Sequence, residues 1–557
     1  MYDFSKKYLV GFIICGLACL CGLAGCTSPD YKKDADEKVY KIIDRKWQDD
    51  FGARVNYKVS DTEPSTGDIR IPKAVPDSGV LSLPQAVAMA TAYNREYQTQ
   101  KEELYIRALD LRLTRHQFER QYFGVVTGGY TADRNDEVVG MEANFGFNRL
   151  LKQGTIISTR IALAWADVLT GNMRSGLTSI LSATITQPLL RGSDSKVVLE
   201  NLTQAERDTL YQVRAFNRFR QTFVVSVVSQ YYGVLQFWDA MENARKNCDT
   251  LDLLIRQVEI LSNAGRVPQL ELERARQDKL RAYDEYIQAQ KQYQKSIDEF
   301  KITLSLPTTA KLRLDTNVLE TLRQSEMTMP DFSDTEAIET ALLRRLDLVN
   351  IADFVTDAQR KVYVAADSLR AELNLVGSAD AASARRAGRQ TLDWTREDYS
   401  LGFELDLPLD RVPEQNVYRK ALLSLNQRLR EYDQAADTVR LDVRNAYRNL
   451  TEAARRYSVQ TEAHQLATKR YKNTLALLQY GRASSRRVLN AQNDLIDARN
   501  NTTQALVDFA VASLNFYSDA GVLQVRPDGM WEKNMDKQPV AGESSFVEST
   551  SKSEIGE

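Results

Sequence analysis

The chain has 557 residues, of which 43% are hydrophobic and 27% are charged, and its formal net charge is -2 at pH 7. This near-neutral balance argues against a nucleic-acid partner, which would require a basic face or tail. The length allows either several ordinary domains or one elongated architecture.

Motifs for catalysis and metal binding are absent from the sequence. The only two histidines, His116 and His464, lie far apart, and we interpret both as helix-surface residues. No metalloprotease H-E-x-x-H, phosphate-binding G-x-x-x-x-G-K, nucleophile elbow G-x-S-x-G or paired C-x-x-C occurs. We therefore predict that the chain is not an enzyme and has no catalytic residues, no metal site and no bound cofactor.

The first 25 residues have the pattern of an export signal. Lys6 and Lys7 precede an apolar run from Tyr8 to Ala24, which ends in small residues before Cys26. The ending Leu23-Ala24-Gly25-Cys26 resembles the lipobox of bacterial lipoproteins. That resemblance implies a covalent lipid such as palmitate on Cys26, and an outer-membrane address because no Asp follows the cysteine. The alternative is an uncleaved membrane helix, for which the run is marginal in length.

The segment after the signal is polar. Residues 26–80 are rich in Asp, Lys and Pro, which predicts a periplasmic tether with one short helix near Val39–Trp47. The mature chain would keep only Cys26 and Cys248, so a disulfide framework is excluded. We interpret Cys248 as a small packing residue.

The positions of proline predict two long helical regions. No proline occurs from Leu189 to Val267 or from Glu414 to Arg526, and proline inside a helix costs about 3 kcal/mol. In the first region, apolar residues recur at coiled-coil spacing from Val213 to Met241. A helix from Ser193 to Ala264 would span about 105 Å. A second helix is predicted to follow and to end near Ser305.

The second region repeats this design, with a helix from Glu414 to Tyr480 and another to about Ala520. Aligning Gly265 with Gly481 also aligns Arg266 with Arg482, Val227 with Val443, Tyr231 with Tyr447 and Asp278 with Asp494. We therefore predict an internal duplication, with one repeat at residues 81–306 and the other at 331–523.

Each repeat also begins with a shorter predicted helix. One starts at Leu83 and runs to about Gln121, and the other follows a capping box at Ser333 and runs to about Ser368. In each repeat the two shorter helices together match the length of the long one. We predict that they stack end to end along it.

Between the short and long helices, apolar residues alternate with polar ones. This period of two predicts strands at Met141–Leu150, Ile156–Asp167, Leu181–Thr186 and Tyr399–Leu407. In an exported chain the pattern is typical of an outer-membrane barrel, although a soluble antiparallel sheet has the same alternation. The first repeat is about 30 residues longer here, which predicts an extra hairpin around Gln153-Gly154 that either lengthens an outer loop or adds strands. Residues 524–557 are rich in Ser and Glu and are predicted to be disordered.

The ordered set of features resembles the TolC-like outer-membrane efflux protein family. It is carried by Leu83-Pro84-Gln85-Ala86-Val87, by the segment from Thr186 to Gly192, and by the duplicated Gly-Arg turns, over roughly Leu81 to Leu523. The resemblance implies a mainly α fold with β: a long antiparallel coiled-coil tunnel plus membrane β-strands, closed only as a homotrimer. In that family each chain gives four strands to a shared 12-stranded barrel.

The resemblance also implies a function. The chain would be the passive outer-membrane exit duct of a tripartite efflux or type I secretion system. Its partners would be a periplasmic adaptor (membrane fusion protein), an inner-membrane pump and outer-membrane lipid. The cargo stays open between drugs, metals and proteins. The alternative is a lipid-anchored periplasmic coiled-coil scaffold without a pore.

The same resemblance places the Gly-Arg turns at the periplasmic tip, where Gly265, Arg266, Gly481 and Arg482 would contact the adaptor. Glycine permits the left-handed backbone of a tight reversal, so plain helix-hairpin turns are the alternative.

The aperture itself is predicted to lie just beyond the second turn, with Arg487, Asn490 and Asp494 as candidate lining residues. Some family members carry aspartate rings there, but Ser484 to Asn490 is basic in this chain, so an acidic gate is not predicted. Three copies of Arg487 would favour anionic solutes, unless Arg487 is only solvated helix surface.

Overall fold

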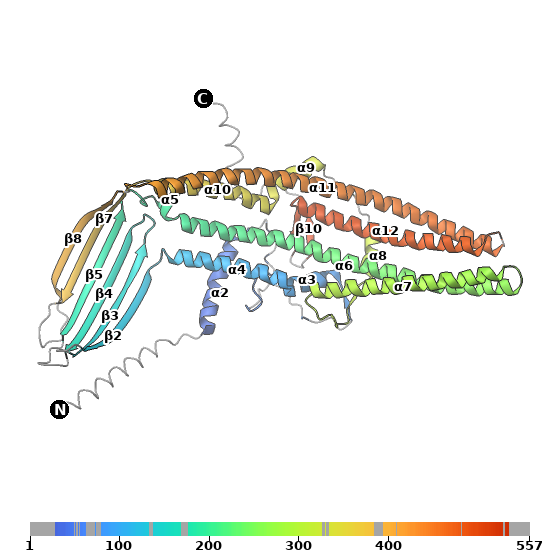
Figure 1. Cartoon of the computed structure of the whole chain (residues 1–557), viewed down its shortest axis with the longest axis horizontal. Coiled ribbons are helices and arrows are strands. Elements are labelled where there is room, and N and C mark those ends of the chain that lie inside the picture. The colour runs from blue at the N-terminus through green and yellow to red at the C-terminus, as the bar shows by residue number, and fades with distance from the viewer. Residues whose placement is uncertain are drawn as a thin grey trace, which may run out of the picture.

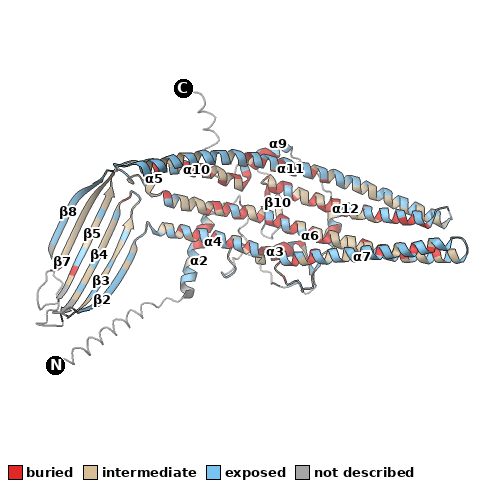
Figure 2. Cartoon of the chain, viewed as in Figure 1, coloured by how far each residue is buried: buried red, intermediate tan, exposed pale blue. Residues whose placement is uncertain are grey.

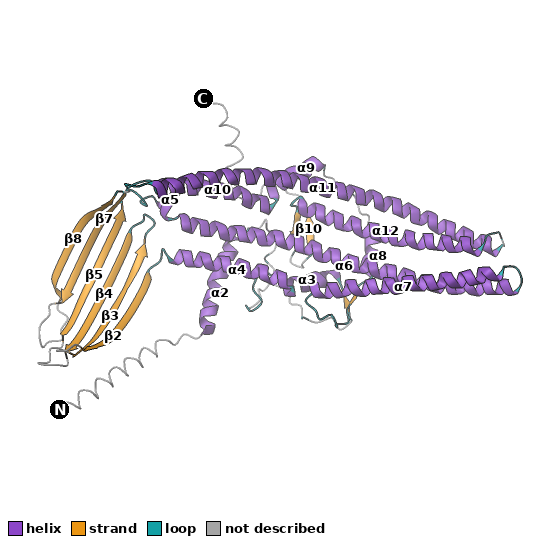
Figure 3. Ribbon diagram, viewed as in Figure 1, coloured by secondary structure: helices purple, strands orange, loops and turns teal. Residues whose placement is uncertain are grey.

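The computed structural model describes residues 28–48, 51, 54, 56–62, 73, 79–132, 137–168, 176–325, 329, 333–383, 394–407, 409–480, 482–526 and 530–533. A β-sheet forms one end of the molecule, and long helices run from it to the opposite end (Figures 1 and 3). The predicted fold class, long antiparallel helices with antiparallel strands, is confirmed. Buried residues concentrate in the middle of the helical part (Figure 2).

The sheet has six strands in the order β2-β3-β4-β5-β7-β8, and all neighbours are antiparallel. The strands are β2 (Gln121–Ala132), β3 (Glu137–Leu150), β4 (Ile156–Val168), β5 (Gly176–Pro188), β7 (Glu372–Ser383) and β8 (Trp394–Asp406). The extra hairpin is β3–β4, and it adds two strands to the sheet instead of lengthening a loop. The count of four strands, which the resemblance implied, is therefore wrong for this chain. Both added strands pair with their neighbours along their length. They also alternate apolar and polar residues, so they continue the two faces of the sheet.

The pairing register defines the two faces of the sheet, because directly opposed residues point to the same side. One face carries an apolar band that crosses all six strands: Tyr122, Val126, Met141, Phe145, Phe147, Ile157, Ile161, Leu163, Trp165, Leu181, Ile185, Leu373, Leu375, Tyr399, Leu401, Phe403 and Leu405. The other face is mostly polar: Thr127, Glu142, Asn144, Asn148, Ser158, Arg160, Ser182, Thr184, Asn374, Ser378, Asp380, Asp398, Ser400 and Glu404. Much of the apolar band is exposed, as at Leu401, which is 77% accessible.

The two predicted long helices are α6 (Glu200–Asn263) and α11 (Val412–Gln479). The short helix α5 (Ser195–Val198) precedes α6, and a break at Leu199 separates the two. Each long helix reverses into a partner, α7 (Gln269–Thr303) or α12 (Ser485–Asp519), which packs antiparallel against it (Figure 1).

Each predicted shorter helix consists of two helices joined at a bend. These are α3 (Leu83–Tyr93) with α4 (Arg95–His116), and α9 (Asp334–Arg344) with α10 (Leu346–Asp367). The bends lie at Asn94 and Arg345, whose backbone is extended. The Asn94 side chain accepts a hydrogen bond from the Tyr97 backbone N–H at 3.1 Å, which caps the new helix. As predicted, α4 and α7 lie along α6, and α10 and α12 lie along α11.

The internal duplication is visible in the packing of equivalent side chains. The rings of Tyr231 and Phe300 are 6.0 Å apart, and those of Tyr447 and Phe516 are 5.9 Å apart. Both members of the second pair lie 216 positions after their counterparts. The same offset relates Gly265 to Gly481, so the register predicted from the sequence holds from the Tyr231–Phe300 contact to the turn in both repeats.

The chain before the first repeat is more ordered than the predicted tether. Residues Ser28–Lys46 form helix α2, which packs against α4 and α6. Val39, Ile43 and the following Trp47 are buried at a spacing of four, which places them on one helix face. The Tyr105 hydroxyl donates to Asp36 Oδ1 at 2.6 Å.

Two short strand pairs and one short helix accompany the long helices. Strand β1 (Val80–Leu81) pairs in parallel with β6 (Arg313–Leu314), and α8 (Asn317–Gln324) follows. After the second repeat, β9 (Leu523–Val525) pairs with β10 (Trp531–Lys533). The predicted disorder is therefore wrong for these strands, because Leu523 and Val525 are buried. Residues 534–557 lie outside the described part.

Candidate functional site

The first Gly-Arg turn closes helix α6 at the end of the molecule opposite the sheet (Figure 1). Gly265 has a φ of +68°, its N–H donates to the Ser262 carbonyl at 2.9 Å, and the Arg266 N–H donates to the Leu261 carbonyl at 2.9 Å. This is the Schellman arrangement, which satisfies the last carbonyls of the helix and requires a left-handed residue. Glycine meets that requirement without steric cost.

The second turn closes helix α11 in the same way. The Arg482 N–H donates to the Leu477 carbonyl at 2.8 Å, and these residues are the counterparts of Arg266 and Leu261. Gly481 lies outside the described residues. Figure 1 places both turns side by side at the far tip of the helices. Their role as helix reversals is clear from this geometry, whereas their predicted contact with an adaptor stays a prediction.

An apolar cluster holds the two helical hairpins together near the tip. It contains Leu251, Leu254, Val258, Leu272, Ala282, Val488 and Leu489, which come from α6, α7 and α12. The Ser485 hydroxyl donates to Glu271 Oε2 at 2.5 Å, so the beginning of α12 is bound to the beginning of α7. Cys248 packs on this cluster, and burial raises the pKa of its thiol. This placement agrees with its interpretation as a packing residue.

Large apolar side chains remain exposed around the turns. Ile260 is 68% accessible, Leu270 59% and Tyr480 79%. Isolated apolar residues are common on protein surfaces, but a group at one end of an elongated molecule offers a surface that a partner can cover. The sequence did not identify these residues, because their exposure depends on how the two hairpins pack.

The three candidate aperture residues lie along one surface of α12. Arg487, Asn490 and Asp494 are separated by three and four positions, which places them on a single helix stripe. Arg487 is exposed and forms no ion pair within the part of the chain that the structure describes. Asp494, by contrast, forms an ion pair in which its Oδ2 lies 2.6 Å from Arg470 Nη1. Its carboxylate is therefore already engaged by the neighbouring helix α11.

A pair of acidic residues between α7 and α12 was not predicted. Burial raises the pKa of Glu285, and the charge of Asp497 raises it further. Burial likewise raises the pKa of Asp497, with Asp494 as a second cause. In the sequence these carboxylates look like ordinary solvated helix residues. Glu285 and Asp497 come close to each other only because the two hairpins pack together, so the sequence alone does not reveal the pair.

A buried ion-pair network joins the two repeats higher in the bundle. Arg214 Nη1 lies 2.6 Å from Asp353 Oδ2, and its side chain is only 1% exposed. Arg207 Nη2 contacts the same carboxylate at 3.0 Å, and Arg207 Nε contacts Asp357 at 2.6 Å. The Tyr211 hydroxyl donates to Asp357 at 2.8 Å. These contacts fix α6 of the first repeat against α10 of the second.

The remaining predicted residues are placed as follows. Cys26, the predicted lipid attachment point, lies outside the described residues. His116 is exposed beside Glu119, and desolvation lowers the pKa of His464. None of the described helices combines the length and the apolar character needed to cross a membrane.

Comparisons with known proteins agree with this architecture. Residues 337–521 match the family model described as outer membrane efflux protein. No curated protein matches the chain by sequence.

Several solved structures have the same fold. CusC is 15% identical over 85% of this chain and 98% of its own, with a TM-score of 0.58. The CmeC outer membrane channel of Campylobacter jejuni is 14% identical over 88% and 93%, with a TM-score of 0.57. The open state of the MtrE outer membrane channel of Neisseria gonorrhoeae is 14% identical over 83% and 96%, with a TM-score of 0.58.

Proposed function

We propose that the chain belongs to the outer membrane efflux protein family, whose model matches residues 337–521, and that it is the passive exit duct of a tripartite efflux or type I secretion system. The observation that carries this proposal is the direct connection of the sheet to two long helices. A sheet with one apolar and one polar face suits a wall between lipid and water. Helix α11, with 68 residues, spans about 100 Å, which suits a conduit through the periplasm.

The proposed assembly is a homotrimer. The sheet of a single chain ends in two unpaired edges, β2 and β8, and open edges cannot remain in lipid because their backbone groups would lack hydrogen bonds. The exposed apolar band needs a lipid environment for a different reason, because apolar side chains are unfavourable in water. Pairing with identical neighbours closes the edges, and lipid around the closed ring covers the apolar band.

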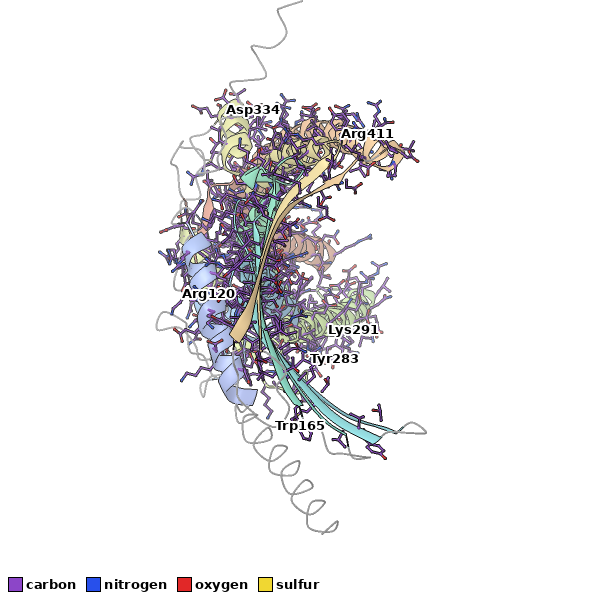
Figure 4. The ribbon with its side chains drawn as sticks, turned by 90° about the vertical axis from the view of Figure 1, so that its left-hand side faces the viewer. Arg120, Trp165, Tyr283, Lys291, Asp334 and Arg411 are labelled. Carbon is purple, nitrogen blue, oxygen red and sulfur yellow. The ribbon has the colours of Figure 1, made fainter. Side chains whose placement is uncertain are left out.

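The proposed partners bind at the tip. A periplasmic adaptor would cover the exposed side chains around the turns that contain Gly265, Arg266, Gly481 and Arg482. The inner-membrane pump would supply the cargo through that adaptor. A covalent lipid on Cys26 would hold the beginning of α2 at the outer membrane, which agrees with the position of α2 on the outside of the curved bundle (Figure 4).

The test is to purify the full-length protein from membranes in detergent and to measure its oligomeric state and conductance. The proposal predicts a trimer that resists mild heating in SDS and that forms ion channels in planar bilayers. A Cys26→Ser variant should lose the lipid mass but should still form channels. A monodisperse rod that becomes soluble without detergent in this variant, and that never conducts, would instead establish the scaffold alternative.

A further inference from the structure

The hairpin β3–β4 is an insertion at one defined point of the first repeat. Before the sheet, equivalent residues lie 251 positions apart, as His116 and Asp367 do at the ends of α4 and α10. The first residues of β2 and β7, Gln121 and Glu372, keep this offset. The last residues of β5 and β8, Pro188 and Asp406, are only 218 positions apart. The pair β7–β8 therefore corresponds to β2 and β5, and β3–β4 lies between them.

The inserted strands are full members of the sheet. Twelve residue pairs join β2 to β3, thirteen join β3 to β4, and eleven join β4 to β5. The apolar band continues through both strands, with Phe145 opposite Ile161 and Met141 opposite Trp165. Such an alternation, aligned with the apolar residues of the neighbouring strands, is not expected of an outer loop. The geometry is that of a wall element exposed to lipid on one face.

The inner turn of the hairpin is fixed where the sheet meets the helices. Gly154 has a φ of +80°, and a Cβ on it would lie 2.5 Å from the Gly192 carbonyl oxygen and 2.8 Å from Pro188 Cγ. The Thr155 hydroxyl donates to Gln187 Oε1, and the Leu151 N–H donates to the Thr155 carbonyl at 2.8 Å. The hairpin thus ends at the level where β5 leads into the helices, so its strands span the same height as the other four.

We propose that three copies of this chain close an eighteen-stranded barrel, in which β8 of each copy pairs with β2 of the next. This inference rests on the proposed trimer. Strand β2 follows helix α4 and runs away from the helices, whereas β8 returns to helix α11, so the two edges meet antiparallel. Six strands per chain is an even number, and all neighbours in the closed ring are then antiparallel. In the end-on view the sheet is already curved as one arc (Figure 4).

The closed barrel would be wider than the twelve-stranded one that the resemblance implied. Barrel diameter grows roughly in proportion to strand number, so the expected diameter is about 1.5 times larger and the cross-section about twice as large. The polar face would line this lumen. Its carboxylates include Glu142, Asp380, Asp398 and Glu404, against Arg160, so the wider lumen would also be acidic.

The decisive experiment is electron cryomicroscopy of the full-length trimer in lipid nanodiscs, beside a variant that lacks residues 137–168. Without β3 and β4, strand β2 can pair with β5 in the register that β7 keeps with β8. The proposal predicts eighteen strands for the natural chain and twelve for the variant. A natural trimer with twelve strands, in which the hairpin lies outside the wall, would overturn it.

Polymer exclusion gives a second measurement that depends on the width of the lumen. Polyethylene glycols added on the barrel side should enter the natural channel at a molecular mass about twice the limit for the deletion variant. Equal limits would contradict the proposal. If the natural chain forms neither trimers nor channels, the proposed function itself fails, and this outcome is distinct from a conducting twelve-stranded trimer.

An engineered disulfide tests the edge pairing and does not depend on the deletion variant folding. In a Cys248→Ser background, a cysteine at Ser400 of β8 is combined in turn with one at Phe123, Val125, Thr127 or Gly129 of β2, all on the same face. At least one pair should give covalent trimers in boiling SDS that a thiol reductant dissociates. Ser400→Cys alone is the control, and failure of all four pairs in a conducting trimer contradicts the pairing of β8 with β2.

Discussion

The two long helices have the same design but very different surroundings within one chain. Helix α6 is packed by α4 and α7 on its own side and by α10 and α12 of the second repeat, whereas the extensive contacts of α11, among the described residues, are with α9, α10 and α12 of its own repeat. Arg214 on α6 is buried against Asp353 on α10. Its counterpart 216 positions later, Arg430, is exposed, and Glu102, the counterpart of Asp353 in the first repeat, is exposed as well.

This difference indicates what covers the second repeat. If three copies form a ring, α11 of one copy faces α4 of the next as α6 faces α10 within the chain. Arg430 then lies opposite the neighbour's Glu102. The ion pair between Arg207 and Asp357 has the counterparts Leu423 and Ile106, which are 46% and 54% exposed and would form an apolar contact. In the proposed trimer, the interface between chains would therefore use the same helix positions as the interface inside the chain.

The largest expected effect comes from the interface inside the chain. Arg214→Met leaves Asp353 buried with one of its two arginines, and breaking a buried ion pair costs about 3–5 kcal/mol. Chemical denaturation of the purified protein should show this loss. Arg430→Met is the matched control at the equivalent position, and it should change the unfolding free energy of a single chain little. If both substitutions changed the unfolding free energy equally and only slightly, the ion pair of Arg214 would not stabilise the chain more than the exposed Arg430 does.

The second effect concerns the interface between chains. Arg430→Glu places like charges together at the proposed contact, so the concentration at which trimers dissociate should rise about tenfold or more. Combining it with Glu102→Arg should restore most of the affinity, as measured by analytical ultracentrifugation in detergent. A double variant that is weaker than both single variants would show that these residues do not face each other.

A smaller effect is expected at the tip, where the repeats differ in charge. Arg487 on α12 corresponds to Glu271 on α7, so at this position the second hairpin carries a basic side chain and the first an acidic one. Arg487→Asp should increase the preference for cations over anions by roughly twofold in reversal-potential measurements on bilayers. Arg486→Asp is the control, because it makes the same charge change outside the stripe. Unchanged selectivity for Arg487→Asp would contradict a lining role for this residue.

The smallest effect is a dependence of tip stability on pH. The pKa values of Glu285 and Asp497 are raised, so their stabilising contribution is complete below their ordinary pKa values and is lost as the pH rises through the raised ones. Beside them lie Asp284, Arg281 and Asp494. The protection factors for hydrogen exchange at the tip, which are corrected for the intrinsic pH dependence of exchange, should therefore be higher near pH 4 than at pH 7.

Asp497→Asn should reduce this dependence and should stabilise the tip at pH 7 by about 0.2–0.5 kcal/mol, because it removes a like-charge contact between neighbouring helices. Asp508→Asn is a matched control, since its pKa is also raised by burial but its position on α12 lies away from Glu285. If tip exchange at pH 7 is equally fast in the natural chain and in Asp497→Asn, the two carboxylates do not repel each other.

The helical design could be predicted from the sequence because proline, glycine and apolar spacing act locally. The bends at Asn94 and Arg345 could not, because neither residue is a helix breaker and both bends are fixed by capping and packing. Helix α2 was underestimated because charged residues surround its apolar face. The network around Arg214 joins residues more than a hundred positions apart, and one sequence holds no signal for such a pairing.

For the site, the two turns were predictable because a tight helix reversal requires a left-handed backbone, which glycine adopts without steric cost. The ion pair of Asp494 with Arg470 was not, because it depends on the register between α11 and α12. The extra hairpin was visible as a length difference between the repeats. Its place inside the sheet followed only from the observed strand pairing.

The position of Gly154 has a consequence for how channels of this kind can diverge. The inner turn of the β3–β4 hairpin packs against the end of β5, close to the helices. After the hairpin, the chain enters β5 in the direction it would have taken without the insertion. Everything downstream, including the junction with the helices, can then remain as it was. In the proposed channel, the width of the barrel can thus change through one local insertion, while the long helices and the surfaces proposed to bind the partners are inherited without change.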